Sequence, residues 1–102
     1  MLALRLRKRI ADCARQFDVA SVWLFGSSLG DESAAGDIDL AVEGLDPKLY
    51  FKFYALLFEA LPKPVDLVDM SQESFIVSIV RETGVRIYER KNSAARIRTA
   101  KH

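Results

Sequence analysis

The stretch that decides the fold runs from Leu24 to Val42 and reads LFGSSLGDESAAGDIDLAV. It predicts the end of a buried strand, a turn rich in glycine and serine, and a second strand that carries Asp37 and Asp39 among apolar residues. Carboxylates in a buried strand are costly, because they lose water and repel each other. A bound divalent cation is the simplest compensation for that cost.

The two carboxylates have the spacing of a cation site. Side chains alternate across a strand, so Asp37 and Asp39 share one face while Ile38 and Leu40 point into the core. The two acids are about 6.6 Å apart along the backbone. Their carboxylates can converge on one Mg²⁺ ion, whose ligand oxygens lie about 2.0–2.1 Å away, or bridge two ions. The alternative is a strand end whose acids face water, and these residues alone do not separate the two interpretations.

The turn before these acids is a candidate anion-binding segment. It follows the apolar run Val19–Phe25, which is typical of a strand covered on both faces. Gly26 has no side chain to block an anion, and a short helix can begin at Ser27 and Ser28, so backbone N–H groups can approach a phosphate. The pair Gly-Ser is common in ordinary turns, so this signal is weak on its own.

The remaining chain alternates helices and strands. Apolar spacings of three and four, proline at helix starts and glycine at helix ends predict helices at 2–17, 47–61 and 71–83, and apolar runs predict strands at 19–25, 37–42, 64–69 and 85–88. With the short helix at the serines, the order is α-β-α-β-α-β-α-(β). We therefore expect an α/β (α+β) fold, a small mixed sheet of three to four strands flanked by about four helices. It forms one domain over residues 1–90, followed by a basic tail, 91–102.

A third acid, Asp66, lies in the strand predicted at 64–69. If that strand neighbours the strand of Asp37 and Asp39, three carboxylates meet at one end or face of the sheet, next to the turn. Hard oxygen ligands of this kind hold the metal ions in two-metal phosphoryl transfer. Asp69 has a different expected role, as a cap for the helix that follows.

The helix predicted at 47–61 is more apolar than one small sheet can cover. Its polar residues Lys48, Lys52 and Glu59 occupy one narrow stripe, and aromatic and aliphatic residues fill most of the remaining circumference. Such excess apolar surface indicates a partner surface, either for a second copy of the chain or for another protein.

Bulk composition excludes several classes of protein. The chain has 102 residues, of which half are hydrophobic, and its net charge of +1 gives no reason to expect nucleic-acid binding. Cys13 is the only cysteine, so no internal disulfide can form. No apolar run approaches the length of a membrane span, and we expect a cytoplasmic protein without membrane contact. The chain also lacks the glycine-lysine end of a P-loop and any zinc-binding cluster.

Two motifs resemble one known superfamily. Leu24-Phe25-Gly26-Ser27, nine residues, then Asp37-Ile38-Asp39-Leu40 resembles the signature of the DNA polymerase β-like nucleotidyltransferase superfamily, and Pro64–Asp69 resembles its third-acid strand. The short chain and the element order resemble the minimal nucleotidyltransferase (MNT) subgroup. The resemblance implies that Gly26 and Ser27 bind nucleotide phosphates and that Asp37, Asp39 and Asp66 are catalytic and hold Mg²⁺, two ions when nucleotide is bound. We include Ser28 with the nucleotide-binding residues.

The resemblance also implies a reaction and a partner. The reaction is transfer of a nucleoside monophosphate, most often AMP from ATP, to a hydroxyl. Many MNT proteins are antitoxins whose partner is a helical HEPN ribonuclease toxin, and some add AMP to a tyrosine of that toxin. We expect this protein to act in the same way on a HEPN-type partner.

Alternatives remain open at this point. The loop after Ser27 is short, and Ser28-Leu29-Gly30 offers no cation for a triphosphate. That charge would be met by metal, by backbone or by a distant residue such as Arg81, Arg86 or the arginines of the first helix. A second interpretation is therefore a weak or inactive module that neutralises its partner by contact alone. A transferase for small molecules is less favoured, because the chain has no second domain to form an acceptor pocket.

Overall fold

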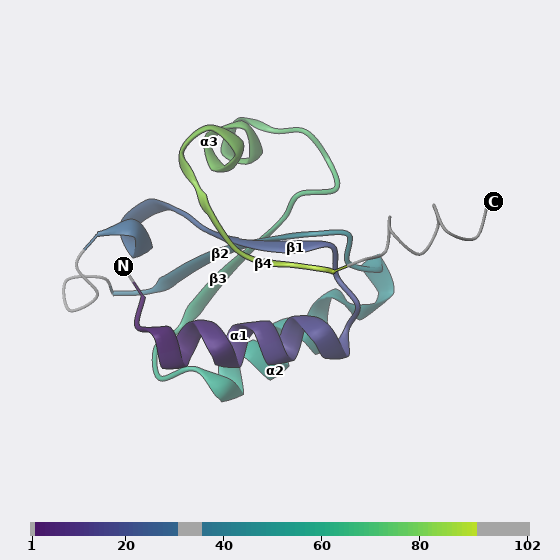
Figure 1. Cartoon of the computed structure of the whole chain (residues 1–102). Coiled ribbons are helices and arrows are strands. Elements are labelled where there is room, and N and C mark those ends of the chain that lie inside the picture. The colour runs from purple at the N-terminus through teal and green to yellow at the C-terminus, as the bar shows by residue number, and fades with distance from the viewer. Residues whose placement is uncertain (1, 31–35, 92–102) are drawn as a thin grey trace.

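The protein is built on one four-stranded mixed sheet. The computed structural model describes residues 2–30 and 36–91. The strand order is β3-β2-β1-β4 (Figure 1), with β1 at Ser21–Leu24, β2 at Ile38–Glu43, β3 at Val65–Asp69 and β4 at Val85–Glu89. β1 pairs antiparallel with β2 and with β4, whereas β2 and β3 are parallel. The sheet expected from the sequence is confirmed, with its last strand present.

Helices cover both faces of this sheet. In Figure 1, α1 (Leu4–Gln16) and α2 (Tyr50–Ala60) lie on one face and α3 (Phe75–Thr83) on the other. Two short 3-10 helices complete the described elements: η1 (Gly26–Leu29) is the short helix expected at the serines, and η3 (Pro47–Leu49) leads into α2. The α/β fold class and the element order are therefore confirmed.

Two apolar clusters hold the layers together. The larger lies between the sheet and the pair α1 and α2, and it includes Ile10, Leu40 and Phe53, none of which is measurably exposed. The smaller lies beneath α3, where Ala41 of β2 packs with Val77 and Val80. Because side chains alternate along β2, Leu40 belongs to the first cluster and Ala41 to the second.

The start of α3 differs from the sequence prediction. Asp69 was expected to cap a helix beginning near Ser71, but its Oδ1 only accepts the N–H of Ser71, at 2.9 Å. The helix begins later, where the hydroxyl of Ser74 accepts the N–H of Val77 at 3.2 Å. The side chains of Asp69 and Ser74 both accept free backbone N–H groups, and serine is as good a helix cap as aspartate. Residue type alone therefore does not predict where α3 begins.

The outer edge of β3 is covered by tyrosines of α2. The Tyr50 hydroxyl donates to the carbonyl of Leu67 at 2.6 Å, and the Tyr54 hydroxyl donates to the carbonyl of Val65 at 2.5 Å. These carbonyls point away from β2, because the alternate residues of β3 bond to it. The two hydroxyls therefore occupy acceptors that an added strand would use.

No helix in the described ranges is long and apolar enough to cross a membrane. The expected tail, 91–102, lies outside the described residues except for Lys91, so the domain boundary near residue 90 stays a prediction.

Candidate functional site

Parallel pairing brings two of the expected acids together. In the register of β2 and β3, Asp39 is the direct partner of Asp66. Neighbouring strands lie about 4.8 Å apart, so the two side chains emerge side by side on the same face. That face carries α3, because Asp39 alternates with Leu40 and shares its side with Ala41. Asp66 is exposed and Asp39 is half-buried, which leaves both carboxylates accessible to a ligand.

Asp37 lies just before β2, two residues from Asp39, and is exposed. Asp37 and Asp39 are at the start of β2, and Asp66 is at the start of β3, which runs parallel to it. The backbone therefore assembles the three expected acids in one region, although only Asp39 and Asp66 are direct partners in the register.

Gly26 allows the turn to approach the carboxylate of Asp39. Its φ of +61° lies in the left-handed region, which other residues adopt at a cost. A Cβ added to Gly26 would lie 2.7 Å from Oδ2 of Asp39, closer than side-chain atoms pack. The left-handed backbone conformation therefore favours glycine here, and a side chain at this position would also displace the carboxylate of Asp39.

The two serines of η1 have different environments. Ser27 is exposed, and its hydroxyl donates to Oδ2 of Asp39 at 3.1 Å. Ser28 is buried, and its hydroxyl accepts the backbone N–H of Asp39 at 2.7 Å while lying 3.5 Å from the carbonyl oxygen of Asp37. Ser27 is thus placed to meet a ligand, whereas Ser28 joins the turn to the backbone on either side of Ile38.

The N–H groups that open η1 belong to Gly26 and Ser27. No hydrogen bond from either group to another described residue is found, whereas the N–H of Ser28 donates to the carbonyl of Phe25 at 3.2 Å. The first N–H groups of a helical turn are the ones left without partners inside it. The backbone of Gly26 and Ser27, beside the carboxylate of Asp39, therefore fits the predicted role in phosphate binding better than that of Ser28.

The donor set fits a hard divalent cation, although the side chains do not yet surround one point. Within residues 2–30 and 36–91, no three Asp, Glu, His or Cys side chains are close enough to form a metal-binding group. The carboxylate of Asp39 is turned toward Ser27 instead. Because the backbones of Asp39 and Asp66 are already adjacent, side-chain rotation is the movement needed for these oxygen ligands to share an ion.

The arginines considered from the sequence as distant phosphate ligands have other contacts. Arg81 lies 3.7 Å from Glu43 and 3.8 Å from Glu73. Arg86 lies over the ring of Trp23, 5.4 Å from its centroid, and 3.6 Å from Glu89. Each of these arginines would have to leave a partner before it could bind a nucleotide.

The role of Ser28 as a link between η1 and β2 is visible only in the structure. Only its burial distinguishes it from Ser27, and burial of one serine in a serine-rich turn has no sequence signal. Tyr50 and Tyr54 belong to the apolar surface that the sequence assigns to a partner, but their hydroxyls fix α2 to the strand of Asp66. The spacing of four residues places these tyrosines on one face of α2, which is the only sign of their joint role.

A mixed sheet of this order, with a glycine-serine turn leading into an Asp-x-Asp strand, defines the nucleotidyltransferase class of folds. Residues 8–93 match the family described as polymerase beta, nucleotidyltransferase. The chain belongs to this family, and the resemblance inferred from its motifs is confirmed. No curated protein matches the chain significantly.

Solved structures support the same fold. A chain of the crystal structure of the toxin-antitoxin MntA-HepT superposes with a TM-score of 0.67 at 24% identity, over 88% of this chain and 75% of that chain. A chain of a toxin-antitoxin crystallised with AMP-PNP gives a TM-score of 0.65 at 25% identity, over 84% and 75%. A third match is in a complex of tri-AMPylated Shewanella oneidensis HEPN toxin with MNT antitoxin, with a TM-score of 0.65, 25% identity and coverage of 89% and 76%.

Proposed function

We propose that this protein is a Mg²⁺-dependent nucleotidyltransferase that transfers AMP from ATP to a hydroxyl of a HEPN-type toxin, and that it acts as the antitoxin of the pair. The observation that carries the proposal is the direct pairing of Asp39 with Asp66 beside the Gly26 turn. Nucleotidyl transfer needs clustered oxygen ligands next to a phosphate-binding backbone. The similar toxin-antitoxin structures, one with AMP-PNP and one with an AMPylated HEPN toxin, support the choice of nucleotide and partner.

Each residue of the site has a distinct part in this proposal. The carboxylates of Asp37, Asp39 and Asp66 would hold Mg²⁺, which when bound neutralises triphosphate charge and favours attack by the acceptor oxygen. The N–H groups of Gly26 and Ser27 would bind the phosphates. The Ser27 hydroxyl, which donates a hydrogen bond to Asp39, would orient that carboxylate or donate to a phosphate oxygen in its place.

Among the described residues, the site has an open face. Asp37, Asp66, Gly26 and Ser27 are all exposed. An open site of this kind suits an acceptor carried on the surface of another protein better than a small molecule that must be enclosed. This openness supports a protein acceptor over a small-molecule one.

The direct test uses the purified protein, its HEPN partner, Mg²⁺ and ATP labelled in the α-phosphate. We expect label on the partner, and no label when Asp37 and Asp39 are both replaced by alanine. The matched control is Asp12→Ala, which removes an exposed carboxylate of α1 and should leave transfer unchanged. A partner that is bound but never labelled by the unaltered protein would show that the proposal is wrong.

The second candidate function is neutralisation by contact alone, favoured by the engagement of Arg81 and Arg86 with other residues. Cells that produce the toxin distinguish the two. Rescue by the double alanine variant, with no label on the toxin, supports contact alone. Rescue by the unaltered protein but not by the double alanine variant supports transfer.

A further inference from the structure

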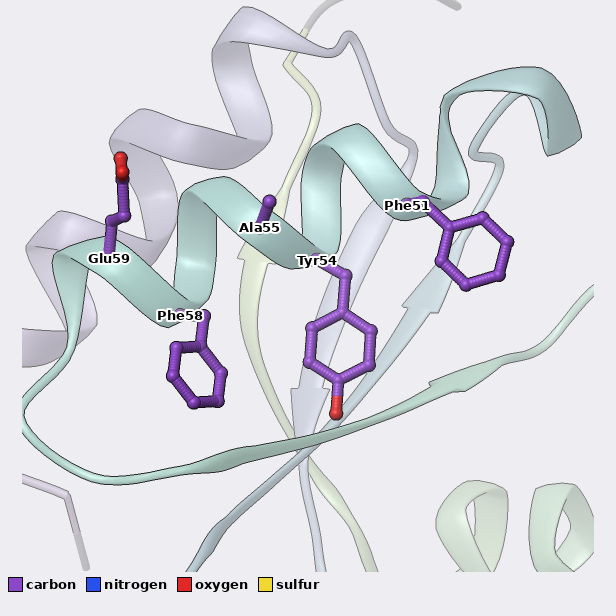
Figure 2. A pocket seen from close by; sticks show the side chains of 5 residues that line it. All are labelled: Phe51, Tyr54, Ala55, Phe58 and Glu59. Carbon is purple, nitrogen blue, oxygen red and sulfur yellow. The ribbon is translucent and has the colours of Figure 1, made fainter.

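The outer face of α2 is an exposed apolar surface, and α2 lies on the face of the sheet opposite α3 and the acids. Phe51 is 80% exposed and Phe58 is 54% exposed, and these rings lie one on each side of Ala55 along the helix. Together with Tyr54 and Glu59 they line a groove of about 410 Å³ (Figure 2). Monomeric proteins rarely expose several neighbouring aromatic rings, so this surface, the α2 face, is suited to a protein contact.

Two opposite charges lie near the ends of the α2 face. Lys52 and Glu59 are both exposed, and neither forms an ion pair with any other residue that the structure describes. Seven residues are almost two full turns of helix, so the two side chains are on the same flank, about 10.5 Å apart along the axis. The flank therefore has a positive end and a negative end.

This arrangement is self-complementary. We propose that the α2 face is the interface of a homodimer, in which α2 packs antiparallel against α2 of a second copy with Ala55 next to the two-fold axis. A two-fold axis perpendicular to both helices places Lys52 of each chain opposite Glu59 of the other, on the same side of the interface. A parallel arrangement, with the two-fold axis along the helices, would instead place the two Lys52 side chains at the same level on opposite flanks, and neither would have Glu59 opposite it.

The centres of the apolar pair and of the charged pair lie one residue apart, on either side of Ala55. Positions 52 and 59 are centred between Ala55 and Leu56, and positions 51 and 58 between Tyr54 and Ala55. One two-fold axis at Ala55 lies between these two centres, so it brings the members of each pair opposite each other to within about 1.5 Å along the helices. The small side chain of Ala55 at this centre lets the helix axes approach to about 8 Å, and each Phe51 can then pack beside Phe58 of the other chain.

The edge of the sheet does not offer an equivalent contact on this side. The hydroxyls of Tyr50 and Tyr54 already occupy the outward carbonyls of Leu67 and Val65. Strand addition at β3 would have to displace both hydrogen bonds. Contact through the α2 face leaves them intact.

The test measures the mass of the full chain by sedimentation equilibrium over a range of micromolar concentrations. We expect a monomer–dimer equilibrium. Lys52→Glu and Glu59→Lys each replace two opposite-charge pairs by like-charge pairs, and each should weaken dimerisation about tenfold. Lys8→Glu, the same charge change on exposed α1, is the matched control and should have little effect.

Mixing the two single variants gives the decisive result. A chain with Lys52→Glu and a chain with Glu59→Lys form only opposite-charge pairs with each other, so their equal mixture should dimerise as tightly as the unaltered protein. The double variant should also recover. A monomer at every concentration, or a mixture no tighter than its components, would overturn the proposal. Mass is measured without nucleotide, so the outcome is independent of the proposed transfer activity.

Discussion

Asp39 of β2 and Asp66 of β3 are direct neighbours across a parallel strand pair, both on the face that carries α3. Like charges directly opposite each other on a sheet destabilise it, by about 0.2–1 kcal/mol in other proteins. The fold therefore places two acidic residues on neighbouring strands where its proposed chemistry needs them, with the carboxylate of Asp39 turned toward Ser27.

Replacing Asp66 by Asn should separate stability from function. Asn keeps the shape of the side chain and removes one of two neighbouring negative charges, so we expect the free energy of unfolding in the absence of Mg²⁺ to rise by less than about 1 kcal/mol, measured by denaturant unfolding. Transfer of labelled AMP should be lost. Asp12→Asn, on exposed α1, should give neither effect. A less stable Asp66→Asn variant would mean that the carboxylates do not repel each other in the folded protein.

Gly26→Ala should disable the turn. The left-handed φ costs a residue with a side chain about 1–2 kcal/mol, and the new Cβ would push against Oδ2 of Asp39. We expect a lower free energy of unfolding and loss of AMP transfer. Gly36→Ala is the matched control, because a Cβ at Gly36 has no neighbour within 4 Å. Equal effects of the two substitutions would contradict the close approach of Gly26 to Asp39.

Ser27→Ala and Ser28→Ala should differ in kind. Ser28→Ala removes the buried acceptor of the Asp39 N–H, so we expect a loss of about 1–3 kcal/mol of stability and faster hydrogen exchange of that amide. Ser27→Ala removes an exposed hydrogen bond, so stability should change by less than about 1 kcal/mol while KM for ATP rises. The roles are reversed if Ser27→Ala is the variant with the faster amide exchange.

The strands of the sheet and the positions of the acids on them could be predicted from the sequence, because both depend on local patterns. The apolar run that ends at Gly26 and the one that begins at Asp37 predict β1 and β2 closely. Alternation along β2 places Asp39 on the face of the sheet opposite to that of the core-facing Leu40. The pairing of Asp39 with Asp66 required one further condition, that their strands are neighbours, which no local pattern contains. The structure supplies that condition.

Burial and side-chain direction could not be predicted in the same way. Ser27 and Ser28 are identical in sequence terms, yet one is exposed and one is buried, because the turn packs against β2. The start of α3 was misplaced for a related reason, since Asp69 and Ser74 are both good helix caps. In each case two residues have the same local preference, and tertiary packing determines which serine is buried and which residue caps α3.

Tyr50→Phe should weaken the attachment of α2 and change the response to alkali. Burial, followed by the nearby Tyr54, Asp69 and Asp66, raises the pKa of Tyr50 above its ordinary value of about 10. As the pH rises past 10 the unfolded chain therefore loses this proton before the folded one does. The stabilisation from the neutral hydroxyl is complete below pH 10 and is lost as the pH climbs toward the folded pKa.

Near neutral pH, Tyr50→Phe loses one hydrogen bond to Leu67, so we expect it to be less stable than the unaltered protein by about 1 kcal/mol. Above pH 10 the difference should shrink, because phenylalanine does not titrate. Denaturant unfolding of both proteins across this range measures the difference directly. Tyr88→Phe, which alters a half-buried tyrosine on β4, serves as the comparison for general alkaline effects. A difference between Tyr50→Phe and the unaltered protein that stays constant above pH 10 would exclude titration of Tyr50 as a source of stability.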